Sequence, residues 1–86
     1  MGRFDVARRL AVFLLDCSGH ENYFDSSTRI LTLPMSRYDI ADYLGTSAES
    51  VTRAIASLEE RGLIRRITAR AIEIRQTDIK AFADLG

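Results

Sequence analysis

The 86-residue sequence has little of what several functional classes require. It contains one cysteine, one histidine, one proline and no tryptophan, which leaves no disulfide framework and no spacing typical of metal ligands. The longest apolar run, 10–15, is far too short to span a bilayer, and no signal-peptide pattern opens the chain. A glycine-rich phosphate loop is lacking, and His20 has no evident partner nucleophile. We therefore expect no cofactor, no metal, no membrane contact and no enzymatic activity.

The lone cysteine, Cys17, lies in an apolar stretch with helical periodicity. A chain without disulfides is typical of the reducing cytoplasm, which is the compartment that we expect. Cys17 is interpreted as an inert packing thiol, with a reactive thiol as the alternative. His20 is interpreted as a polar surface residue.

Charge is balanced over the whole chain but not along it. The net charge is zero, which opposes strong non-specific binding to nucleic acid. Five arginines nevertheless gather in a short segment in which Glu73 is the only acidic residue: Arg61, Arg65, Arg66, Arg70 and Arg75. Such a cluster is either a solvated basic edge or a contact surface for phosphates.

The composition, 47% hydrophobic and 28% charged, is that of one small globular domain. Asp5 is expected to cap a first helix that runs to about Cys17. Two short stretches, 22–24 and 29–33, then predict a hairpin that Pro34 closes, because proline cannot continue a ladder of backbone hydrogen bonds.

The middle of the sequence predicts two helices separated by a tight turn. Ser36, with Asp39 three residues later, is expected to cap the first of these helices, and Gly45 ends it. Ser47 is expected to cap the second helix, which runs to about Arg61, before the stop at Gly62.

A second hairpin and a last helix are predicted after Gly62. The hairpin consists of 63–67 and 71–75 around the turn 68–70. Thr77 is expected to cap the last helix, in which Ile79, Phe82 and Leu85 cover the core. The predicted order is helix, hairpin, helix, turn, helix, hairpin, helix. We therefore expect one α+β, mainly α domain over residues 1–86, a winged helix-turn-helix with the helix pair at 36–61 and the wing at 63–75.

The helix after Ser47 carries a candidate base-reading face. At about 100° per residue, Glu49, Thr52 and Arg53 share one side of its first two turns, opposite an apolar stripe. Arginine can donate two hydrogen bonds to guanine, glutamate can accept one from the cytosine amino group, and threonine offers a methyl or a hydroxyl group. The simpler interpretation is a solvent-facing ion pair between Glu49 and Arg53. Small residues on the same side favour close approach to a groove.

Four further residues are candidate phosphate contacts. Ser36 and Arg37 open one helix and Ser47 the next, where free backbone N–H groups attract phosphates. Each serine is expected to cap its helix whether or not it also contacts a phosphate. Arg70, at the tip of the second hairpin, is either a phosphate contact or a solvated turn residue.

The segment 35–58, MSRYDIADYLGTSAESVTRAIASL, closely resembles the helix-turn-helix signature of the Crp/Fnr family of bacterial transcription regulators. The resemblance covers the whole signature, including the leading LPMSR, the helix DIADYLG and the spacing of Glu49, Thr52 and Arg53. DVARRLAVFLLDCS resembles the helix that follows the family's dimerisation helix, and LEERGLIRR and AIEIR resemble its wing strands.

The resemblance implies the DNA-binding part of a homodimeric regulator that binds a palindromic operator, with RNA polymerase as a further partner. The pattern is similar to the Fnr and FixK branches, whose half-sites contain TTGA; the Crp branch has an arginine where this chain has Ala48. It implies that Arg53 reads guanine and Glu49 cytosine, and that Ser36, Arg37 and Ser47 contact phosphates. The family's sensory β-roll and dimerisation helix have no counterpart in these residues, so this part is expected to be monomeric or a weak dimer. The wing turn 68–70 also lacks the glycine often found there.

An alternative from another class is a winged-helix module for protein–protein contact. Zero net charge favours this alternative, with the basic hairpin docking on an acidic partner. A salt titration distinguishes the two functions, because specific DNA binding weakens steeply as salt is added.

Overall fold

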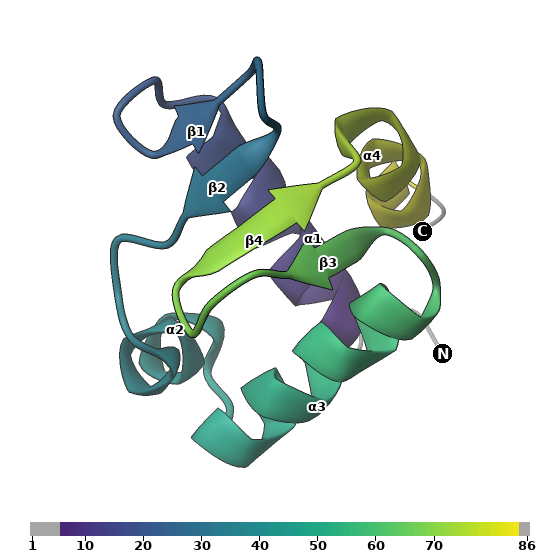
Figure 1. Ribbon diagram of the computed structural model, residues 1–86. Coiled ribbons are helices and arrows are strands. Elements are labelled where there is room, and N and C mark those ends of the chain that lie inside the picture. Colours follow the sequence, from purple (N-terminus) through teal and green to yellow (C-terminus); the bar gives the residue numbers. More distant parts are fainter. Residues whose placement is uncertain (1–5, 85–86) are drawn as a thin grey trace.

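The computed structural model describes residues 6–84, so Asp5 and Leu85, two residues of the predicted helix termini, lie outside the described residues. The described chain forms four helices and four strands in the expected order (Figure 1). The elements are α1 (Val6–Ser18), β1 (Phe24–Asp25), β2 (Ile30–Thr32), α2 (Arg37–Leu44), α3 (Ala48–Glu60), β3 (Ile64–Arg66), β4 (Ala71–Ile74) and α4 (Gln76–Asp84). Within 6–84, no helix is long and apolar enough to cross a membrane.

The two hairpins join into one antiparallel sheet with the strand order β1-β2-β4-β3. The pairing of β2 with β4 places Leu31 opposite Ile72, although some forty residues of chain separate them. Sequence analysis predicted each hairpin but not this pairing, because no local signal links two strands so far apart. The result is the predicted α+β fold, a winged helix-turn-helix in which β3, the turn 67–70 and β4 form the wing.

The core lies between the inner face of the sheet and the helices. Figure 1 shows α1 passing behind the sheet, with α3 beside β3 and α4 at the far end of the strands. The larger side chains that are almost completely buried come from every layer: Leu10, Leu14, Leu31, Ile40, Val51, Leu58, Ile74 and Ile79. Ile79, as predicted, seals the core from α4, and Phe82 packs against it at the edge.

Local capping signals fix the ends of the two central helices, and three predictions are confirmed there. The Ser36 hydroxyl accepts the Asp39 N–H at 3.3 Å and donates to the Asp39 carboxylate at 3.2 Å. Gly45 ends α2 in the left-handed conformation, with φ of 73°, which a residue with a Cβ atom adopts only with strain. Ser47 caps α3 by accepting the Ser50 N–H at 3.1 Å.

The predicted cap of the last helix is wrong. Helix α4 begins at Gln76, and its first helical hydrogen bond runs from Ile79 N–H to the carbonyl of Arg75, so Thr77 lies inside the helix. A tertiary contact accounts for the earlier start. The Gln76 side-chain amide donates to the Ser18 hydroxyl at 3.0 Å, which fastens the first residue of α4 to the end of α1.

Candidate nucleic-acid interface

Helices α2 and α3 are joined by a short turn whose backbone groups are satisfied locally. The Gly45 N–H donates to Asp42 O at 3.2 Å and the Thr46 N–H to Ala41 O at 2.9 Å. These bonds take up carbonyls that α2 would otherwise leave open at its end. The two helices are therefore held in a defined relation before any ligand binds.

The predicted division of α3 into two faces is present. Val51, Ile55 and Leu58 are buried, whereas Glu49 and Arg53 are exposed and Thr52 is half-buried between them. Within residues 6–84, no ion pair or hydrogen bond joins Glu49 to Arg53. Both side chains lie in the first half of α3. The simpler interpretation, a solvent-facing salt bridge between them, is not present in the described residues.

The four candidate phosphate contacts lie at the starts of helices and at the wing. Ser36 and Ser47 hold the N-termini of α2 and α3, and their hydroxyls are engaged as caps. Arg37 is the first residue of α2 and is half-buried, and its Nε is shielded from solvent with no hydrogen-bond partner among residues 6–84. Arg70 is exposed in the turn between β3 and β4.

The wing turn closes without a glycine. Ile67 and Thr68 donate their N–H groups to Ala71 O at 2.9 and 3.0 Å. The Thr68 hydroxyl accepts the backbone N–H groups of Arg70 at 3.3 Å and Ala71 at 3.0 Å. No residue of 67–70 has a positive φ. A threonine side chain thus supplies the bond that fixes this turn.

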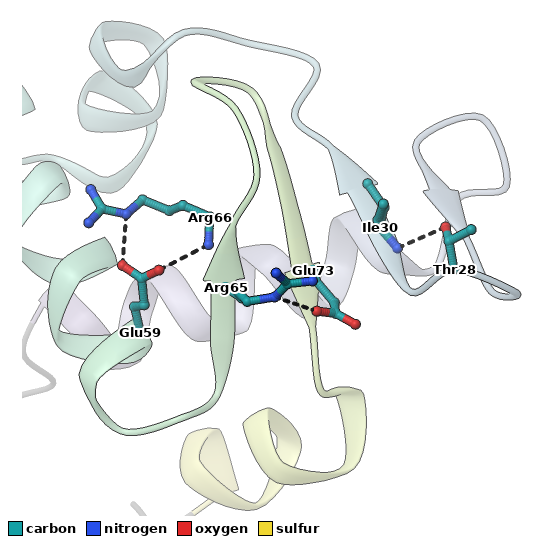
Figure 2. Close-up of polar contacts among 6 residues, drawn as sticks. All are labelled: Thr28, Ile30, Glu59, Arg65, Arg66 and Glu73. Atoms are coloured by element: carbon teal, nitrogen blue, oxygen red, sulfur yellow. Dashed lines mark hydrogen bonds and ion pairs between the residues drawn. The ribbon is translucent and has the colours of Figure 1, made fainter.

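The arginine cluster is less free than its sequence indicates. Arg65 pairs with Glu73 at 2.9 Å, and Arg66 pairs with Glu59 at 2.8 Å (Figure 2). The guanidinium of Arg61 lies 5.0 Å from the ring centroid of Phe82, a distance typical of a cation–π contact. Sequence analysis named only Glu73 as an opposing charge. It missed Glu59, which lies seven positions before Arg66 on the other side of the helix end.

The Glu59 carboxylate is held by both the backbone and the side chain of Arg66. Its Oε2 accepts the Arg66 N–H at 3.2 Å and its Oε1 accepts the Arg66 Nε–H at 2.8 Å. The backbone hydrogen bond, followed by the side-chain bond and the charge of Arg66, lowers the pKa of Glu59 from its ordinary value. Glu59 is therefore ionised over the whole neutral range.

A second contact that sequence analysis missed holds the end of α2. The Arg9 guanidinium, from α1, donates a hydrogen bond to the carbonyl of Leu44, the last residue of α2. Beside it the rings of Phe13 and Tyr43 make a tilted contact, with their centroids 5.4 Å apart. Arginine near the C-terminus of a helix is a favourable partner for its open carbonyls, but only the fold brings Arg9 to that place.

Cys17 lies near the end of α1 and His20 in the loop that follows it, outside α2, α3 and the wing. Cys17 is buried, and the burial, together with the neighbouring Asp16 charge, raises the pKa of its thiol. The rings of the exposed His20 and of Tyr23 make a T-shaped contact, with centroids 5.8 Å apart. Across 6–84, no group of three or more histidine, cysteine, aspartate or glutamate side chains is placed to hold a metal ion.

The comparisons with known sequences agree on one kind of protein. Residues 8–85 match the family of the Crp-like helix-turn-helix domain. The nitrogen fixation regulation protein FixK of Rhizobium meliloti is 42% identical over 78 residues, which cover 91% of this chain and 35% of FixK. The transcriptional activatory protein AadR of Rhodopseudomonas palustris is 36% identical over 64 residues, which cover 74% of this chain and 27% of AadR. The chain thus spans about a third of the length of these curated relatives.

Solved structures share the fold. FixK2 from Bradyrhizobium japonicum has a TM-score of 0.81 and 32% identity, over 99% of this chain and 41% of that one. The CO-dependent transcription factor CooA from Carboxydothermus hydrogenoformans has a TM-score of 0.77 over 93% of this chain and 37% of that one. At 23% identity, the second likeness concerns the fold alone.

Proposed function

We propose, on the premise that this chain belongs to the Crp-like helix-turn-helix family, that it binds double-stranded DNA sequence-specifically and serves bacterial transcription regulation in the cytoplasm. One observation carries the proposal: the exposed face of α3 presents Glu49 and Arg53, with Thr52 between them, and no internal ion pair within 6–84 engages them. A recognition helix in the major groove uses this part of its length to contact base edges.

Each side chain of this face has a distinct role in the proposal. The Arg53 guanidinium donates two hydrogen bonds to O6 and N7 of a guanine, and Glu49 accepts one from a cytosine amino group. Thr52 contacts the methyl group of a thymine. This set fits a TTGA-like half-site. The exposed Ala56, one turn after Thr52, lets the helix approach the base edges closely.

Phosphate contacts set the register of α3 in the groove. The N-termini of α2 and α3, with Ser36, Arg37 and Ser47, bind phosphates on one side of the groove, and Arg70 binds one beside the wing. In the full-length regulator two such domains form a homodimer on a palindromic operator. One domain alone binds weakly, because it lacks the linked second contact.

Replacement of Arg53 by alanine tests the base-reading role. Fluorescence-anisotropy titration with a TTGA palindrome should show a loss of about 1–3 kcal/mol in binding free energy, with relaxed preference at the guanine. Arg75→Ala is the matched control, because Arg75 is also exposed but lies at the end of β4 away from the wing turn. If Arg53→Ala and Arg75→Ala bind alike, Arg53 does not read the base. Selection of bound sequences from a random pool, with two domains joined as a dimer, then identifies the half-site.

A second candidate function is a protein–protein module. The zero net charge and an open, mainly apolar groove of about 270 Å³ between α1, α2 and α4, lined by Val12, Phe13 and Tyr43 among others, favour this function. RNA polymerase is one partner that fits a regulator. A DNA affinity that depended on neither salt nor sequence would favour the protein–protein function over the first.

A further inference from the structure

Beyond its own hairpin, the wing is attached to the rest of the domain on both sides: β4 pairs with β2, and Glu59 of α3 binds β3. Leu33, three residues before Ser36, donates its N–H to the carbonyl of Arg70 at 2.7 Å. On the other side, Glu59 of α3 binds the backbone and the side chain of Arg66, the last residue of β3. The wing turn is therefore connected to the segment that leads into α2 and to the last turn of α3.

The position of β3 in the sheet explains why the second attachment is needed. Among the strands of the described residues, β3 is an edge strand that pairs only with β4, so one side of its backbone faces away from the sheet. An unpaired N–H on an edge strand is normally left to solvent or to another chain. Here the Glu59 carboxylate takes the Arg66 N–H on that side, and the Arg66 guanidinium closes over the same carboxylate (Figure 2).

The neighbouring ion pair on β3 differs in what it joins. Arg65 and Glu73 are opposite each other in the register of β3 and β4, two strands that backbone hydrogen bonds already hold together. Loss of that pair would leave the backbone hydrogen bonds between β3 and β4 in place. The pair between Arg66 and Glu59 instead joins the wing to the helix that carries Glu49, Thr52 and Arg53.

We infer that Glu59 is a positioning residue for DNA binding: it fixes the wing relative to α3, so that Arg70 meets the DNA backbone while α3 lies in the groove. The inference rests on the proposed function of α3 and of Arg70. Glu59 itself touches no DNA in this arrangement. Glu59 contributes to DNA affinity only by holding the wing in position. The contribution is therefore lost when Arg70, the wing residue that binds a phosphate, is replaced by alanine.

Glu59→Asp is the variant that tests this role. The side chain keeps its negative charge, so the long-range electrostatics of DNA association are preserved, but it is one methylene too short to hold both groups of Arg66. Glu73→Asp is the matched control, because it shortens the carboxylate that pairs with Arg65 inside the wing hairpin. We expect Glu59→Asp to weaken operator binding about three- to tenfold, in the range of coupling between linked residues, and Glu73→Asp to leave it unchanged.

A double-mutant cycle with Arg70→Ala separates positioning from general damage. In the Arg70→Ala background, Glu59→Asp should weaken binding much less than in the original chain. Equal losses in both backgrounds would overturn the inference, because Glu59 would then act by a route other than the wing. Thermal unfolding of each variant checks that the domain is folded at the temperature of the titration.

Measurements without DNA keep the test independent of the proposed function. In ¹⁵N relaxation on the free chain, Glu59→Asp should increase the mobility of 67–70 and speed amide exchange at Arg66, whereas Glu73→Asp should do neither. An unchanged wing in Glu59→Asp overturns the inference even if DNA binding is confirmed. If the original chain binds no DNA at all, the proposed function fails, while relaxation still decides whether Glu59 holds the wing.

Discussion

At the residue scale, Ser47 has two roles that one substitution can separate. Its hydroxyl accepts the Ser50 N–H and so caps α3, and the same helix end is proposed to bind a phosphate. Aspartate caps a helix as well as serine does, but its charge repels a phosphate.

Ser47→Asp should therefore leave the free energy of unfolding within about 0.5 kcal/mol of the original, while Ser47→Ala lowers it by about 1 kcal/mol. DNA affinity should follow the opposite order, with the larger loss in Ser47→Asp. Urea denaturation and anisotropy titration measure the two quantities. A Ser47→Asp variant with undiminished affinity would place the phosphate elsewhere.

Cys17 gives a prediction on pH. Burial raises the pKa of its thiol above the ordinary 9.0, so the folded state holds the proton more tightly than the unfolded state. The protonated thiol makes its full contribution to the free energy of unfolding below pH 9.0, and this contribution is lost as the pH rises through the folded-state pKa. The difference in unfolding free energy between the original chain and Cys17→Ala should shrink from neutral pH to above pH 10. A constant difference over that range would contradict the assignment.

The residues that sequence analysis placed correctly are those whose signal is local. Ser36, Gly45 and Ser47 act on backbone groups within four positions, so spacing alone reveals them. Arg9 and Glu59 were missed because their partners come from another element, and no residue type marks such a pair. Thr77 was misplaced for the same reason, since the start of α4 is fastened by a bond from the neighbouring Gln76 to Ser18 in another element.

At the element scale, α2 depends on α1 for the position of its end. The hydrogen bond from Arg9 to the Leu44 carbonyl connects the two helices just before the turn that leads to α3. Loss of this bond would free the last turn of α2 and, through Gly45, shift the start of α3.

Arg9→Ala should lower the free energy of unfolding by about 1–2 kcal/mol, the contribution of a partly buried hydrogen bond from a charged donor. Amide exchange at 44–46 should quicken more than elsewhere in α2. Lys80→Ala, a cationic residue exposed on α4, is the control and should change neither quantity. Uniform acceleration throughout the domain would show that Arg9 acts on global stability alone.

At the scale of the whole molecule, α4 closes the core from the side opposite the wing turn. The Ile79 side chain has no exposed area, and the Arg8 and Arg61 guanidiniums lie 5.9 and 5.0 Å from the ring of Phe82 on the same helix. The helix is therefore part of the cooperative unit rather than an appendage.

Ile79→Ala should destabilise the domain by about 2–5 kcal/mol, as a buried isoleucine reduced to alanine leaves a cavity. Unfolding should remain a single transition by both circular dichroism and fluorescence. Ile67→Ala is the matched control, because the Ile67 side chain is 43% exposed in the wing, and its effect should stay below about 0.5 kcal/mol. Two separate transitions in Ile79→Ala would mean that α4 unfolds independently.

The sequence predicted the order of the elements but not how the two hairpins meet. Periodicity and turn residues indicate each helix and each hairpin, and the buried stripe of Val51, Ile55 and Leu58 orients α3. The pairing of Leu31 with Ile72 depends on which strands approach in three dimensions, which no short window contains. The same holds for the candidate site. Local signals predicted the exposed face of α3, but they did not predict the contacts that attach the wing to β2 and to α3.

The pairing of β2 with β4 also makes the helix-turn-helix a closed loop. At one end of the pair the Ile74 N–H donates to Arg29 O, and at the other end the Leu33 N–H donates to Arg70 O. Both helices, α2 and α3, lie in the chain between Leu33 and Arg70. A break in the chain at 26–28 would leave this loop closed. A break at 45–47 would open it, and the chain would regain the conformational entropy that loop closure removes. Because backbone groups close this loop, substitutions of the exposed side chains of α3 during evolution would leave the loop closed.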